Sequence, residues 1–181
     1  MADSNLTQSL IAAGSGLLGV IIGGFISYYT QAGQAKEERK QRRISMATSI
    51  AAEIEAYLDL MHFRRHSEKA KNMAAMLRAG QIVELRGFAF ADDTPLAQFP
   101  VFSKLMDKIG ELGPICSDLA KYYTLIAGVR VTEISLERGQ YDKLPPATKA
   151  QLIEDELKVW ESALALGTQL VPRLKQLAKQ G

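Results

Sequence analysis

The sequence predicts an all-α protein in which one N-terminal transmembrane helix precedes a long amphipathic helix and a small helical bundle. Three observations predict this class. A long uncharged apolar segment lies near the N-terminus, apolar residues recur at helical spacing through most of the remainder, and no segment alternates convincingly like a half-buried strand. With 181 residues, 47% hydrophobic and 23% charged, the chain can form one folded domain besides the membrane segment.

The apolar segment is the strongest single feature of the sequence. No charged residue stands between Asp3 and Lys36, and residues 10–30 include nine strongly apolar side chains. At about 1.5 Å per residue, a helix of this length spans roughly 30 Å, the hydrocarbon thickness of a bilayer. We therefore expect a transmembrane helix over residues 10–30, preceded by a short tail over residues 1–9.

A basic cluster follows the apolar segment, within residues 31–43. Its members are Lys36, Arg39, Lys40, Arg42 and Arg43. Because no Lys or Arg precedes the segment, a cleaved signal peptide is disfavoured, and the positive residues predict a cytoplasmic C-terminal side. We expect the N-terminus outside the cell (inner) membrane, the domain of residues 44–181 in the cytoplasm, and the cluster on anionic lipid headgroups. From Ile44 onward 17 basic residues balance 17 acidic ones, so no nucleic-acid partner is expected.

Small residues recur every fourth position inside the apolar segment, at Ser15, Gly19, Gly23 and Ser27. Such a strip allows two membrane helices to approach closely and predicts self-association. The alternative is that small residues are simply frequent in membrane helices.

The next part predicts a long helix over residues 34–79 that ends before Gly80. Apolar residues at spacings of three and four form a seam made of Ile44, Ala47, Ala51, Ile54, Leu58 and Met61. This spacing is typical of a coiled coil, but it covers fewer than three heptads, so an amphipathic helix packed on its own domain is the favoured interpretation. Charged residues past Met61 indicate a break or a change of partner, after which Met73, Met76 and Leu77 resume an apolar face.

Residues 81–100 have no regular pattern and contain or adjoin four phenylalanines, which are Phe88, Phe90, Phe99 and Phe102. They predict either a loop pinned onto the core by its aromatic side chains or a partner-binding loop. The two interpretations remain open from the sequence.

Three further helices are expected. The first covers residues 101–112 after Pro100, with Met106 among its inward residues; the second covers residues 115–138; and the third begins at Pro145-Pro146. Pro172 should kink or restart this last helix because proline lacks the N–H that a helix interior requires.

Two histidines raise the question of a metal. His62 and His66 lie four residues apart, where one helix face would present both, and Asp59 would be a third ligand. Phe63, however, stands where the zinc-protease signature needs glutamate, and the neighbouring arginines and lysines would repel a cation. A solvated basic face is the favoured interpretation, and no metal is expected.

No catalytic or nucleotide-binding motif stands in a supporting context. Cys116 is the only cysteine and is expected to be a small buried hydrophobe rather than a reactive thiol. The predicted function is therefore non-enzymatic, without a cofactor: a single-pass membrane-anchored interaction or scaffold protein that binds itself and a cytoplasmic protein. An oligomeric pore or lysis protein is the alternative, and an enzyme is a third class.

Overall fold

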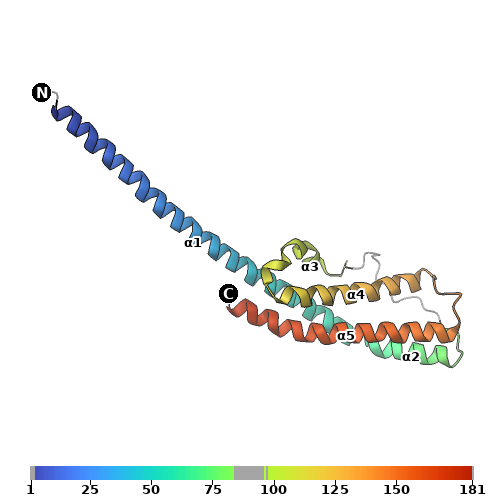
Figure 1. Cartoon of the computed structure of the whole chain (residues 1–181). Helices are drawn as coiled ribbons and strands as arrows, with labels where there is room; N and C mark the ends of the chain where they lie inside the picture. The colour runs from blue at the N-terminus through green and yellow to red at the C-terminus, as the bar shows by residue number, and fades with distance from the viewer. Residues whose placement is uncertain (1–2, 84–95, 97, 181) are drawn as a thin grey trace. The chain divides into compact units, whose positions relative to one another are not determined.

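The computed structural model describes the backbone of residues 3–83, 96 and 98–180, together with their side chains except for residues 3–29 and 32. Its elements are α1 (Asp3–Phe63), α2 (His66–Arg78), α3 (Pro100–Leu105), the 3₁₀ helix η1 (Met106–Leu112), α4 (Ile115–Glu137) and α5 (Pro146–Gln180) (Figure 1). Every regular element of these described ranges is helical, which confirms the predicted all-α class. The chain divides into two compact units, Met1–Arg42 and Arg43–Gly181.

The first unit contains the predicted membrane segment. The backbone of α1 is helical through it, but the side chains of residues 10–29, with the strip Ser15, Gly19, Gly23 and Ser27, lie outside the described residues. Among the residues that the structure does describe, no helix is long and apolar enough to cross a membrane.

In the second unit, the seam of α1 faces the domain's own core. Ala47, Ala51, Ile54 and Met61 are buried, while Ile44 and Leu58 are half-buried. The amphipathic interpretation therefore accounts for the seam, since all of these residues except Ile44 belong to or pack against one hydrophobic cluster with residues of α4 and α5.

The expected break falls between α1 and α2. Arg65 has φ 50°, the left-handed conformation that most side chains avoid. With Arg64 it forms the two-residue link between α1, which ends at Phe63, and α2. At its other end α2 stops as predicted: Gly80 has φ 75°, its N–H donates to the Leu77 carbonyl, and the next N–H donates to the Met76 carbonyl. This pairing is the Schellman ending of a helix.

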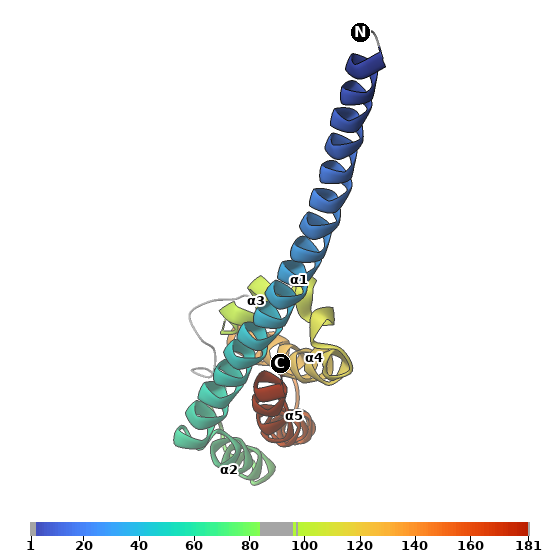
Figure 2. The same ribbon diagram turned by 90° about the vertical axis from the view of Figure 1, so that its left-hand side faces the viewer.

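α4 and α5 run antiparallel, and α5 packs on both α4 and α2; Figure 2 looks nearly along the axes of α4 and α5. Gly167 on α5 is fully covered: a Cβ there would lie 2.8 Å from Tyr122 Cε2 and 3.3 Å from Leu58 Cδ2. The glycine therefore sets how closely α5 approaches the helices beneath it.

Pro172 does not restart the helix, so that alternative was wrong. α5 continues through Pro172 to Gln180. Pro172 and Thr168, whose carbonyl loses its donor, are both exposed, so solvent can take the place of the missing N–H.

The predicted helix over residues 101–112 is instead two short elements, α3 and η1. Met106 begins the 3₁₀ segment and is 47% exposed, contrary to the inward position expected for it, because a 3₁₀ turn of three residues shifts the inward face. Met76, expected on the apolar face of α2, is also exposed.

A carboxylate from another helix fixes the start of α3. Glu53 on α1 accepts hydrogen bonds from the backbone N–H groups of Val101 at 2.6 Å and Phe102 at 3.1 Å, and from the Tyr123 hydroxyl at 3.1 Å. It caps α3 in the way that a polar side chain normally does from within the helix itself.

Candidate functional site

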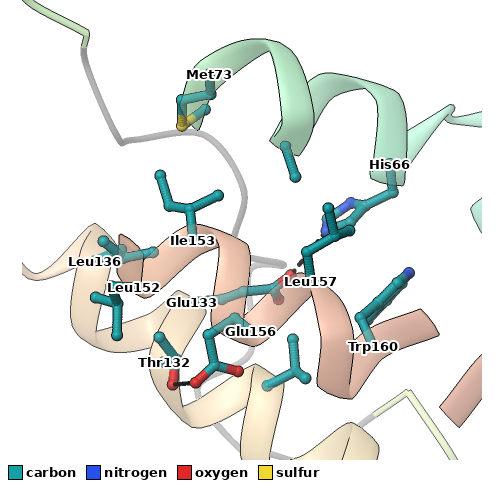
Figure 3. Close-up of a pocket in the computed structure, with 12 residues that line it drawn as sticks. His66, Met73, Thr132, Glu133, Leu136, Leu152, Ile153, Glu156, Leu157 and Trp160 are labelled. Atoms are coloured by element: carbon teal, nitrogen blue, oxygen red, sulfur yellow. Dashed lines mark hydrogen bonds and ion pairs between the residues drawn. The ribbon is translucent and has the colours of Figure 1, made fainter. Parts of the chain in front are cut away.

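A small concavity of the domain lies between α2, α4 and α5 and has a volume of about 60 Å³ (Figure 3). Each helix contributes residues at helical spacing, so one face of each of the three helices lines the same concavity. The lining residues are His66, Ala70, Met73, Val129, Thr132, Glu133, Leu136, Leu152, Ile153, Glu156, Leu157 and Trp160. Most are apolar, and almost all of the surface that they present to the concavity is apolar.

A buried ionic group forms one wall. Glu133 accepts a hydrogen bond from Arg130 Nη1 at 3.1 Å through Oε2, and its Oε1 lies 3.2 Å from His66 Nε2. Arg130 is 2% exposed and Glu133 is 8% exposed. Charges so far from water persist only when they are paired, so this group holds α2 and α4 together.

His66 has a second contact. Its ring stacks on the Trp160 indole with the centroids 4.6 Å apart and the planes 27° from parallel. His66 is also the first residue of α2, directly after the strained Arg65. The strained backbone of Arg65 therefore lies beside the contacts that fix where α2 begins. We call the group formed by His66, Arg130, Glu133 and Trp160 the α2 network.

Glu156 is the second carboxylate at the cavity. Within the described part of the chain it accepts one hydrogen bond, from Thr132 Oγ1 at 2.8 Å, and forms no ion pair (Figure 3). Burial raises the pKa of its carboxyl above the usual value; the Thr132 hydrogen bond lowers that pKa, and the charges of Glu133 and Asp155 raise it further. Unlike Glu133, this carboxylate forms no ion pair with any Lys, Arg or His side chain that the structure describes.

Elsewhere, five rings from α1, the α3 region and α4 form an aromatic core, made of Tyr57, Phe99, Phe102, Tyr122 and Tyr123. Phe102 stacks on Tyr123 at 3.6 Å between centroids, and Tyr57 lies 4.7 Å from Phe99. Burial is the main cause that raises the pKa of all three tyrosines. These hydroxyls therefore serve structure rather than proton transfer near neutral pH.

The structure places the other predicted site residues apart. In the basic cluster, Lys36, Arg39, Lys40, Arg42 and Arg43 are exposed. Phe99 and Phe102 are 0% and 5% exposed, so they pin the chain onto the core and offer no surface to a partner. Phe88 and Phe90, the rest of the predicted partner-binding loop, lie outside the described residues.

His66 corrects the predicted basic face. It is half-buried against Glu133 and Trp160 instead of being solvated, because the break at Arg65 turns it away from the line of His62 on α1. In the part of the chain that the structure covers, no three His, Cys, Asp or Glu side chains lie together as a metal ligand set. Cys116, expected to be buried, is only half-buried.

The sequence contained a signal for the α2 network that the motif search did not use. The inward stripe of α4, from Ile115 through Ile126 and Val129, continues at helical spacing to Arg130 and Glu133. A charged pair on a buried stripe predicts an internal ion pair, although it does not name His66 as a third member.

Comparison of the chain with models of protein families, with curated proteins and with solved structures found no match.

Proposed function

We propose that the protein is a single-pass, membrane-anchored helical interaction or scaffold protein that holds its domain at the cytoplasmic face of the cell (inner) membrane. One observation carries the proposal: an uncharged apolar segment over residues 10–29 is followed directly by five basic residues, whereas the chain from Ile44 onward is charge-balanced. The apolar segment is long enough to insert into a bilayer, and the positive residues on one side of it determine its orientation.

The energetics support insertion. Nine strongly apolar side chains contribute roughly −3 to −5 kcal/mol in total, at about −0.3 to −0.6 kcal/mol each near the centre of a span. The helical backbone of α1 through this segment also satisfies its own N–H and C=O groups, which hydrocarbon requires.

Membrane association is tested by extracting membranes with alkaline carbonate after expression of the full-length chain. The protein is expected to remain with the membranes, and a variant carrying Leu18→Lys and Ile22→Lys is expected to be released. Lys36→Ala is the matched control, because it alters a charge outside the span. Release of the unaltered protein by carbonate would overturn the proposal.

Orientation is tested with C-terminal reporters that work on only one side of the membrane. We expect fluorescence from a green fluorescent protein fusion and no activity from an alkaline phosphatase fusion, since the positive residues keep the domain in the cytoplasm. Phosphatase activity would reverse the proposed topology.

Self-association is proposed through the strip of Ser15, Gly19, Gly23 and Ser27. Gly19→Leu with Gly23→Leu should lower the dimer signal in a membrane two-hybrid assay, because larger side chains separate the two backbones. Leu17→Ile is the control on the same helix. An unchanged signal in the double variant would remove this part of the proposal.

A cytoplasmic protein partner is proposed at the loop residues Phe88 and Phe90 alone, since Phe99 and Phe102 are buried. A photoreactive phenylalanine analogue at Phe88 should crosslink to a discrete second protein in cells. The same analogue at Val131, which is exposed on α4, is the control. Equal crosslinking from both positions would contradict a specific partner there.

A further inference from the structure

We propose that one face of α1, formed by Lys36, Arg39 and Lys40, binds the headgroups of anionic phospholipids and gathers them on one side of the helix where it leaves the bilayer. We call these three residues the basic face. This inference rests on the proposed membrane anchor, and it adds the class of lipid that the anchored chain selects.

The spacing of the three residues makes the basic face one-sided. The backbone of α1 is helical from Asp3 to Phe63, and an α-helix turns by about 100° per residue. Lys36, Arg39 and Lys40 stand at positions i, i+3 and i+4, so they lie within an arc of about 100° around the helix axis. One lipid headgroup on that side can therefore contact more than one cation.

The opposite side of the same segment carries acidic and amide side chains. They are Gln34, Glu37, Glu38 and Gln41, which by the same rotation lie within a second arc of about 100° on the far side of the helix. Gln41 Nε2 donates a hydrogen bond to Glu37 Oε1 at 3.0 Å. The segment is thus divided into a positive side and a side that is acidic or neutral.

Within the described chain, no carboxylate neutralises the basic face. Its three side chains are exposed, and Glu37 binds Gln41 instead of Lys40, although a separation of three residues allows an ion pair on a helix. In the domain, by comparison, Lys175 pairs with Glu55 at 2.8 Å. The basic face therefore offers its positive charge to an anionic partner outside the chain.

The position of the basic face along the chain favours lipid as that partner. From the end of the proposed span at residue 30, Lys36 lies roughly 9 Å and Lys40 roughly 15 Å beyond the hydrocarbon edge, at about 1.5 Å per residue. Headgroups occupy about the first 5–8 Å, and the Debye length is about 8 Å at physiological ionic strength. All three cations therefore lie within electrostatic reach of the lipid phosphates.

Lipid selection is measured on the full-length protein reconstituted in vesicles that mix phosphatidylcholine with phosphatidylglycerol. Electron spin resonance of spin-labelled forms of the two lipids gives the fraction of each that the protein restricts. We expect phosphatidylglycerol to be favoured at least about fivefold, the effect of a single cation near an anionic surface. Raised salt should reduce this preference, because it screens the charges.

Neutralising the basic face should remove the preference. The combined variant Lys36→Gln, Arg39→Gln and Lys40→Gln is expected to lower it below about twofold. The matched control removes three exposed lysines from the domain, with Lys104→Gln, Lys108→Gln and Lys121→Gln, and should leave the preference unchanged. Loss of the preference in the control as well would mean that net charge, and not this face, selects the lipid.

A second variant tests the one-sided arrangement without changing composition or net charge. Exchanging Lys36 with Glu37 and Lys40 with Gln41 distributes the positive residues around the helix. It should lower the preference, because one headgroup then contacts fewer cations. An unchanged preference in this variant would overturn the role of the basic face.

Carbonate extraction of the same vesicles separates this proposal from the membrane anchor. Release of the protein would remove the anchor, and the basic face would then have no headgroups beside it. Retention of the protein with equal association of the two lipids would overturn lipid selection alone and indicate an acidic protein as the partner of this face.

Discussion

The two halves of α5 are held by different kinds of interaction. Its C-terminal half packs beside the aromatic core on α1 and α4, where Gly167 lies in close contact with Tyr122 and Leu58. Its N-terminal half faces α2 across a cavity, and the buried charges of the α2 network hold the surrounding helices in place. Apolar and aromatic packing dominates the first region, whereas a buried pair of opposite charges distinguishes the second.

Ion pairs on the surface of α2 add to this contrast. Arg78 donates to Glu154 Oε1 at 2.7 Å from Nε, and Lys71 pairs with Glu161 at 2.8 Å. Both contacts are exposed to solvent, so each contributes little to stability. The attachment of α2 therefore depends more on the buried α2 network than on its surface ion pairs.

The largest expected effect comes from breaking the α2 network. Glu133→Gln should destabilise the domain by about 3–5 kcal/mol, because it removes the buried carboxylate that pairs with Arg130 and contacts His66. Urea unfolding of the full-length protein, followed by Trp160 fluorescence, measures the loss. Arg130→Met with Glu133→Leu removes both charges and should come close to the unaltered stability. A loss below about 1 kcal/mol in the single variant would show that the charges are not what holds α2.

Two adjacent tyrosines test the aromatic core. Tyr123→Phe should destabilise by about 1.5–3 kcal/mol, since its hydroxyl donates to the Glu53 carboxylate that also caps α3. Tyr122→Phe is the matched control, because within the described chain its buried hydroxyl has no hydrogen-bond partner and its removal should not lower stability. Thermal unfolding of the two variants gives the comparison. Equal losses would mean that ring packing, and not the Glu53 cap, determines the effect.

The tight packing of α5 is tested with two glycines. Gly167→Ala should destabilise by about 1–3 kcal/mol, because the added methyl group overlaps the Tyr122 ring in a filled core. Gly128→Ala, inside α4 with nothing within 4 Å of the added atom, should stabilise by about 0.5–1 kcal/mol through helix propensity. Urea unfolding of the two variants measures these opposite changes in the free energy of unfolding. A stabilising effect of Gly167→Ala would mean that the helices can move apart at this position without losing stability.

The smallest expected effect concerns the break before α2. Arg65→Gly should stabilise by up to about 1 kcal/mol, because glycine adopts positive φ without steric strain. The ion pair lost with Arg65, at 3.8 Å to the exposed Glu68, contributes little. Calorimetry compares the stability of this variant with that of Arg64→Gly, at the neighbouring position. The comparison separates the relief of backbone strain at Arg65 from a general effect of glycine. Destabilisation by Arg65→Gly alone would show that the arginine side chain itself supports the turn.

Much of the fold was predictable because its signals are local. Gly80 and Gly139 end α2 and α4 with positive φ, and Pro100 and Pro146 begin α3 and α5. The seam of α1 was equally visible, since helical spacing alone brings those residues to one face. The restart at Pro172 was wrongly predicted because the tolerance of a helix for proline depends on solvent reaching the carbonyl one turn earlier, which the sequence does not show.

The candidate site was less predictable because its contacts join distant positions. His66 meets Glu133 and Trp160, which stand 67 and 94 positions further along the chain. The two histidines suggested a metal or a basic face as long as one straight helix was assumed. Only the turn at Arg65 directs His66 inward.

By itself, the sequence determined the helical class, the ends of most helices, the inward face of α1 and the segregation of charge after residue 30, because each follows from neighbours within a few turns. Tertiary structure alone decided that Glu53 caps α3, that Gly167 must remain small, and that Glu133 lies between Arg130 and His66. The physical reason is that burial and pairing are properties of the space between helices, which no single segment defines.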